Sequence, residues 1–228
     1  EQLERTRARF TTLTDVCQPL HTGGLDTVTA QSIAPQPLVW FWPNRIPAGM
    51  YSFLVGDPGA GKSFLSCYIA AIASTGGFWA DGTAVGEPMD VLMFITEDNL
   101  ARTVVPRLNA HGADLQRVHF CQGVTAGGQS RLFNIDENMG LLKRKLDTLP
   151  GCKLILFDPV TGFMGDVNQN SQSEVRSVLG RICQLAEDRG VTIIGLSHLN
   201  KKVELDMRHR SVGSVAFNAV PRAVWGVF

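Results

Sequence analysis

The residues best suited to chemistry in this 228-residue sequence form one continuous stretch, Gly56-Asp57-Pro58-Gly59-Ala60-Gly61-Lys62-Ser63. It follows an apolar run at 51–55 and precedes a helix-like run that begins at Phe64. Strand, glycine-rich loop and helix occur here in the order of a P-loop, or Walker A motif. The glycines let successive backbone N–H groups face one phosphate, and the helix N-terminus adds its positive dipole end. The stretch predicts nucleotide binding by residues 56–64.

Two residues of this stretch carry specific expectations. Lys62 is expected to reach the β- and γ-phosphates of ATP, and the Ser63 hydroxyl to bind Mg²⁺. Lys62 is also expected to be a solvent-facing loop cation, so that its loss leaves the fold intact.

Asp158 is the second candidate for the metal site. It follows four apolar residues, 154–157, in the Walker B pattern. A carboxylate beside Ser63 would hold Mg²⁺ and its waters. The alternative is a strand-ending Asp that starts a turn with Pro159.

Hydrolysis also needs a group that orients or deprotonates the attacking water. Asp158 is followed by Pro159, so the Asp-Glu pair of many motor ATPases is missing. Glu97, which follows the apolar run 91–95, is the available carboxylate. It could instead be a first-turn helix acid favoured by the helix dipole, and Asp98 is the neighbour that could take its place.

Apolar runs that indicate buried strands alternate with helical patterns along the chain. The predicted strands are residues 51–55, 91–95, 117–121, 153–158, 191–196 and 223–227. This alternation favours an α/β fold with a largely parallel sheet covered by helices on both faces. Because ligands bind at the carboxyl ends of such strands, Glu97, Asp158 and His198 are expected to meet the P-loop there.

The rest of the chain limits the class of protein. Lys+Arg and Asp+Glu both number 21, so the net charge predicts no general affinity for polyanions. Five scattered cysteines and the lack of a long apolar stretch are typical of a cytoplasmic protein without disulfides or membrane spans. Residues 1–34 are expected to be a polar arm or linker, helical over 1–10, and residues 35–228 a nucleotide-binding domain truncated at its C-terminal end.

Two further segments have specific expectations. The aromatic stretch 38–42 is either an extended segment packed on the core or a surface that stacks on a nucleotide base. Residues 123–130, which include three glycines, are expected to form a flexible loop.

The P-loop, Glu97, the run 154–158 and the segment 197–201 together resemble the RecA-like ATPases. Within that group, the sequence is most similar to the RepA-type hexameric replicative helicases and their phage and plasmid relatives. Arg107-Leu108 and the segment 214–222 strengthen the likeness, which covers about residues 38–228. The resemblance implies a RecA-like fold, ATP and Mg²⁺ as cofactors, a homo-oligomeric ring and a role in DNA replication. A primase or a replication initiator is an implied partner, and a membrane is not.

The resemblance also implies roles for single residues. Lys62 and Ser63 would bind phosphate and Mg²⁺, and Glu97 would activate water. His198 would sense the γ-phosphate and link it to a DNA-binding loop; the alternative is a histidine that is simply hydrogen-bonded at a strand end.

The loop 201–210 occupies the DNA-facing position of these relatives. Its four basic residues, Lys201, Lys202, Arg208 and Arg210, are the candidate contacts to single-stranded DNA. An ordinary solvated loop explains the composition equally well.

Arg222 is the candidate arginine finger, which would act on the nucleotide of a neighbouring subunit. The developing charge on the γ-phosphate calls for a second cation besides Lys62. Pro221 holds the backbone before Arg222, and the resemblance implies an arginine near this position. Arg107 and Arg210 are the alternatives, as is a merely solvated arginine.

The leading hypothesis is therefore an Mg²⁺-dependent ATPase motor that couples hydrolysis to single-stranded DNA binding or unwinding. The alternative is a nucleotide-switched regulatory, recombination or repair ATPase without helicase activity. A small-molecule kinase ranks last because no arginine-rich lid is evident in the sequence.

Overall fold

The computed structural model describes residues 25–198 and 214–228, and the chain divides into two compact units, Glu1–Pro37 and Leu38–Phe228. In the first unit, residues 25–37 are exposed and irregular apart from one 3₁₀ turn, η1 (Ala30–Ser32). The helix expected at 1–10 lies outside the described residues. All other described elements belong to the second unit.

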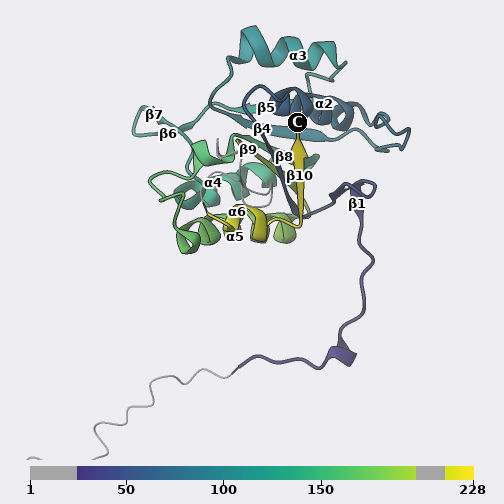
Figure 1. Cartoon of the computed structure of the whole chain (residues 1–228), viewed down its shortest axis with the longest axis vertical. Helices are drawn as coiled ribbons and strands as arrows, with labels where there is room; N and C mark the ends of the chain where they lie inside the picture. The colour runs from purple at the N-terminus through teal and green to yellow at the C-terminus, as the bar shows by residue number, and fades with distance from the viewer. Residues whose placement is uncertain (1–24, 199–213) are drawn as a thin grey trace, which may run out of the picture. The chain divides into compact units, whose positions relative to one another are not determined.

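The centre of the second unit is a six-stranded parallel sheet in the order β10-β3-β9-β8-β4-β5 (Figure 1). Its strands are β3 (Tyr51–Gly56), β4 (Asp90–Ile95), β5 (Val118–Cys121), β8 (Cys152–Asp158), β9 (Thr192–His198) and β10 (Ala223–Val227). Every described pairing in this sheet is parallel. The predicted fold class is confirmed, and each strand expected from an apolar run is present.

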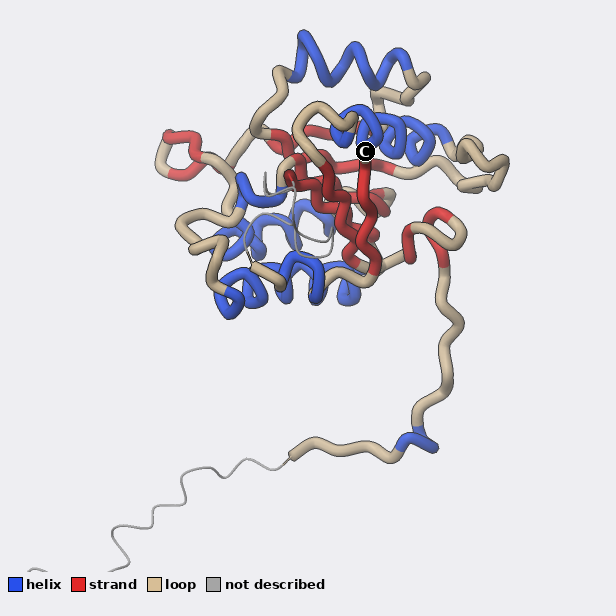
Figure 2. The backbone as a smooth tube through the Cα atoms, in the orientation of Figure 1, coloured by secondary structure: helices blue, strands red, loops and turns tan. Residues whose placement is uncertain are grey.

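Helices cover both faces of this sheet (Figure 2). They are α2 (Lys62–Thr75), α3 (Val105–Ala110), α4 (Ile135–Asp147), α5 (Gln172–Arg189) and α6 (Ala216–Ala219). Alternate strand residues point to opposite faces, so Leu54 and Met93 share a core with α2 and α3. Phe53 and Phe94 belong to the other core, with α4, α5 and α6. Two short turns, η2 (Leu100–Val104) and η3 (Val160–Phe163), lead away from β4 and β8.

The longest helix, α5, shows how local sequence sets an element. The Ser171 side chain accepts a hydrogen bond from the Glu174 N–H at the N-cap, a contact that stabilises a helix by about 1 kcal/mol. Val175, Leu179 and Ile182 form its buried stripe at helical spacing. Gly190 ends the helix with a φ of 58°, a conformation that favours glycine.

The aromatic stretch before the sheet forms a small antiparallel pair, β1 (Trp40–Trp42) and β2 (Ile46–Pro47). The Trp42 ring stacks on Trp79 with centroids 4.6 Å apart, and the Arg45 guanidinium lies 5.0 Å from the Trp42 ring centroid. Phe41 is buried. These contacts support the packing alternative for this stretch over base stacking.

The expectation of a loop at 123–130 is wrong. The segment contains a hairpin of β6 (Val124–Ala126) and β7 (Gln129–Arg131). Gly127 and Gly128 join the strands with φ values of 58° and 78°, as a two-residue hairpin turn requires. A Gly-Gly pair is therefore a turn signal here, and the expectation took it as a sign of flexibility.

Candidate nucleotide-hydrolysis site

Four adjacent strands bring the predicted catalytic residues to one edge of the sheet. In the spatial order β3, β9, β8 and β4, the carboxyl ends lead to the P-loop, His198, Asp158 and Glu97. Gly56 lies level with His198, and Ile95 lies level with Asp158. Segments far apart in the sequence therefore share one edge, because parallel strands end on the same side.

The P-loop connects β3 to α2 through backbone conformations that need glycine. Gly61 has a φ of 89° immediately before the first residue of α2, so that the helix N-terminus faces the loop. At Gly56, a Cβ atom would lie 2.2 Å from the Val227 carbonyl oxygen of the neighbouring strand β10. Close packing of β3 against β10 thus positions the start of the loop. Phe64 is exposed, and its ring contacts the edge of His111 at 4.4 Å.

Lys62 is buried, so the expectation of a solvent-facing lysine is wrong. Its ammonium donates hydrogen bonds of 2.9 Å to the carbonyl oxygens of Gly56 and Asp57, because the side chain folds back over the loop. Burial lowers its pKa, while the nearby carboxylates of Asp158, Asp57 and Glu97 oppose this shift.

A chain of three side chains crosses the site from the P-loop to β4. The Lys62 ammonium lies 3.2 Å from Nδ1 of His198, and Nε2 of His198 lies 3.4 Å from Oε2 of Glu97. An ammonium group only donates, so Nδ1 accepts and the proton of the neutral ring belongs on Nε2, facing the carboxylate. His198 therefore joins the phosphate-binding lysine to the candidate water-activating acid.

Asp158 lies at the end of β8 against the first turn of α2. Its carboxylate accepts a hydrogen bond from the Ser63 hydroxyl, and the Ser66 hydroxyl lies 3.5 Å from its Oδ2. Burial raises the pKa of Asp158, while Ser63 and Lys62 counteract that shift. Ser66 was not among the expected site residues; its signal in the sequence is a serine one turn after Ser63 inside an apolar helix.

Ser63 and Asp158 together fit Mg²⁺. Both present oxygen atoms, the ligand type that Mg²⁺ prefers, and Mg²⁺ commonly keeps several waters and substrate oxygens besides one or two protein ligands. Within 25–198 and 214–228, no group of three or more His, Cys, Asp or Glu side chains could hold a metal by itself. The arrangement suits a metal that arrives with a nucleotide.

The two neighbouring acids after β4 have different partners. Asp98 forms an ion pair with Arg107 of α3 at 2.6 Å. Glu97 is 60% exposed and faces His198. Asp98 and Arg107 therefore neutralise each other within the subunit, and Glu97 is the acid that lies open to a water beside the P-loop.

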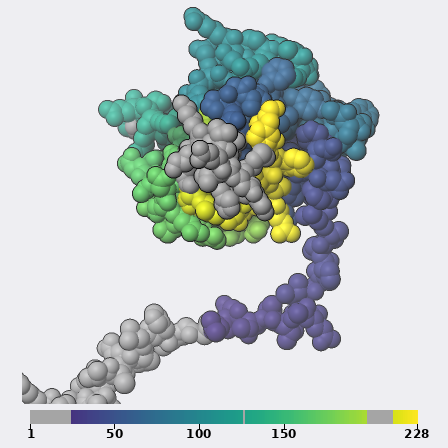
Figure 3. Space-filling view, in the orientation of Figure 1, coloured from purple at the N-terminus to yellow at the C-terminus, as the bar shows by residue number. Residues whose placement is uncertain are grey.

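Arg222 lies at the opposite edge of the sheet, just before β10. Its backbone N–H donates to the Tyr51 carbonyl at the start of β3, and its side chain is exposed. Figure 3 shows the C-terminal residues at the surface of the unit. The structure does not bring Arg222 together with the P-loop of its own subunit. Lys201, Lys202, Arg208 and Arg210 lie outside the described residues.

Comparisons with known proteins agree with this geometry. A family model described as an AAA domain matches residues 18–204. Among solved structures, the fold is similar to one described as the ATPase domain of another protein, with a TM-score of 0.56 and 11% sequence identity. That match covers 78% of this chain and 69% of the other. Within the described ranges, no helix is long and apolar enough to cross a membrane.

Proposed function

The chain belongs to the AAA domain family and has a RecA-like P-loop ATPase fold, and from this premise we propose an Mg²⁺-dependent motor of the RepA-like helicase type. It couples ATP hydrolysis to single-stranded DNA binding or unwinding within a homo-oligomeric ring. A primase or a replication initiator is the kind of partner that such a motor serves.

The observation that carries this proposal is the Lys62–His198–Glu97 chain. His198 is the last residue of β9, and the chain continues directly from it into the basic segment 201–210. A change at the phosphate site therefore reaches the base of that segment through one side chain. A nucleotide-binding protein that moved nothing would not need this connection.

The residues divide the chemistry as follows. Lys62 exchanges its two carbonyl hydrogen bonds for phosphate oxygens, which removes the donor from Nδ1 of His198 and frees the imidazole to reorient. Glu97 holds the attacking water and accepts its proton. Bound between Ser63, Asp158 and the phosphates, Mg²⁺ would neutralise charge on the phosphate oxygens.

The DNA contacts in this proposal come from Lys201, Lys202, Arg208 and Arg210. Contacts between these cations and phosphates release counterions, so binding weakens as salt rises. The zero net charge of the chain leaves this local cluster as the source of any such affinity.

The test compares ATP turnover with and without single-stranded DNA. We expect DNA to stimulate turnover in the parent protein. A variant with Gln at all four basic positions should lose the stimulation and retain basal turnover. Its salt slope should be shallower by about 0.7 for each lysine or arginine that no longer neutralises a phosphate.

The matched control carries Gln at four exposed cations elsewhere, Arg131, Arg144, Lys153 and Arg176. It has the same change in net charge and should respond to DNA as the parent does. Turnover that ignores DNA in the parent protein would favour the nucleotide-switched regulatory or repair ATPase instead.

A further inference from the structure

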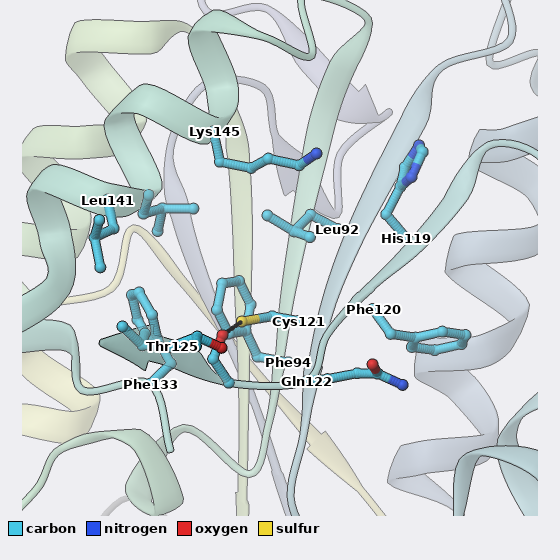
Figure 4. Close-up of a pocket in the computed structure, with 13 residues that line it drawn as sticks. Leu92, Phe94, His119, Phe120, Cys121, Gln122, Thr125, Phe133, Leu141 and Lys145 are labelled. Atoms are coloured by element: carbon cyan, nitrogen blue, oxygen red, sulfur yellow. Dashed lines mark hydrogen bonds between the residues drawn. The ribbon is translucent and has the colours of Figure 1, made fainter. Parts of the chain in front are cut away.

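A second cavity, of about 530 Å³, lies at the β5 edge of the sheet, away from the P-loop (Figure 4). Its walls come from the face of the sheet that packs on α4. Leu92 and Phe94 of β4 form one side, and Phe133, Leu141 and Leu142 form the other. The volume falls in the range of small-molecule sites, about 300–1,000 Å³.

The local sequence explains why the cavity stays open. β5 is a four-residue edge strand, and the chain leaves it through Gly123. Gly123 has a φ of 141°, and a Cβ there would lie 2.7 Å from the Arg131 carbonyl oxygen. This close approach joins β5 directly to the β6–β7 hairpin. Val124 and Thr125 then line the cavity in place of a covering helix.

The polar groups around the cavity favour an anion. No Asp or Glu is among its lining residues. Figure 4 shows Lys145 reaching across one end, above Leu92, toward the side of the sheet that carries His119. Nε2 of His119 is buried without a hydrogen bond, and its nearest acid is Asp90, at 3.6 Å.

Lys145 differs from a nearby lysine on the same helix. Lys143 pairs with Asp188 at 3.2 Å. In the part of the chain that the structure describes, the Lys145 ammonium has no ion pair, and it is exposed at the rim of the cavity. Lys145 is therefore the cation at this rim that is available to a ligand.

Cys121 adds a neutral wall. Its thiol donates to the Gly123 carbonyl with the sulfur 3.9 Å from the oxygen. Burial raises the pKa of this thiol. The group stays protonated at neutral pH and adds no negative charge.

We propose that this cavity binds a small amphipathic carboxylate, with its apolar body between Leu92, Phe94 and Leu141 and its anionic head on Lys145. The apolar walls account for the body, and the unpaired ammonium beside an acid-free lining accounts for the head. The proposal goes beyond the ATPase function and does not depend on it. Since β4 also leads to Glu97, an occupant would stabilise the strand that positions that acid.

The test uses two fluorescent probes on the full chain. 1-Anilinonaphthalene-8-sulfonate combines aromatic rings with one anionic head, and N-phenyl-1-naphthylamine has the same rings without the charge. We expect Lys145→Gln to weaken binding of the sulfonate about fivefold or more and leave the neutral probe unchanged. Lys143→Gln, the control on the same helix, should change neither affinity.

Two further measurements identify the cavity and the head group. Leu141→Asp, at an exposed position on the rim, should weaken both probes by placing a carboxylate there. 1-Naphthoate should displace the sulfonate probe, and 1-naphthalenemethanol should not. Equal sulfonate affinity in Lys145→Gln and the parent, or equal displacement by the acid and the alcohol, would overturn the proposal.

Discussion

The carboxyl and amino edges of the same sheet differ sharply in their chemistry. The carboxyl edge gathers the P-loop, Asp158, His198 and Glu97, and hydrogen bonds link several of these groups. The amino edge carries Arg222, held by its backbone to Tyr51 with its side chain exposed. β10 pairs with β3 so that Ala223 lies level with Ser52 and Val227 with Gly56.

This register separates Arg222 from the start of the P-loop by the length of β3, roughly 16 Å at 3.3 Å per residue. One subunit therefore holds the phosphate cradle, the metal ligands and the water-activating acid without the candidate finger. The contrast teaches that Arg222 can serve catalysis only in another subunit's site, which makes assembly a condition of full activity.

The largest effect is expected from Lys62→Ala. Removing the ammonium deletes the phosphate contact and the link to His198, so ATP turnover should fall to background in a steady-state assay. Because Lys62 is buried, circular dichroism and a thermal melt must accompany the assay. Lys143→Ala, which removes an ammonium from α4, is the control and should keep full turnover. Unchanged turnover in Lys62→Ala would remove the P-loop assignment.

Arg222→Ala tests the amino edge and should lower turnover by about a thousandfold, the effect of losing an arginine finger. Mixing it with Lys62→Ala decides where the arginine acts. A mixed ring places an intact Arg222 beside an intact P-loop, so activity should return although each variant alone is inactive.

Assembly of the mixed rings must be confirmed by light scattering. Mixed rings that form and stay inactive would return Arg222 to a solvated arginine, and Arg107 or Arg210 would become the next candidate. Arg107 already pairs with Asp98 in its own subunit, so Arg210 would be tested first.

Glu97→Gln keeps the shape of the side chain and removes the base, so turnover should fall about a hundredfold while ATP binding persists. Asp98→Asn breaks the pair with Arg107, a partly exposed contact, and should lower turnover less than about tenfold. Turnover and binding of a fluorescent ATP analogue are measured for both. If the two variants exchange these behaviours, Asp98 is the catalytic acid.

The smallest effect concerns stability. Burial raises the pKa of Asp158 in the folded protein above its ordinary value of 3.8. The unfolded chain therefore loses this proton first, and the folded state becomes less stable as pH rises through the interval between the two values. Asp158→Asn removes this cost, so without nucleotide or Mg²⁺ it should melt at a higher temperature than the parent at pH 8.

At pH 3 the parent carboxyl is protonated in both states, and the difference in melting temperature between Asp158→Asn and the parent should be small. An equal increase at pH 3 and pH 8 would show that the ionised carboxylate is not the cause. Asp188→Asn is the control with the opposite shift. Hydrogen bonds from Gln184 and Lys143 lower the pKa of Asp188, so its loss should destabilise the protein at pH 8.

The sequence by itself determined the elements whose signals are local. Each buried strand is an apolar run, and the P-loop has its glycines, lysine and serine at consecutive positions. The convergence of Glu97, Asp158 and His198 also followed from sequence, since parallel strands with helical crossovers must end at one edge. Backbone sterics and hydrophobic periodicity suffice for these conclusions.

Only the tertiary structure decided which side chains are partners across that edge. The order of the strands places β9 between β3 and β8, which puts His198 between Lys62 and Glu97. Packing of α3 gives Asp98 its arginine and leaves Glu97 open. The burial of Lys62 and the cavity beside β5 likewise depend on contacts between distant segments. No local pattern carries this information, because each contact is set by how separate elements pack.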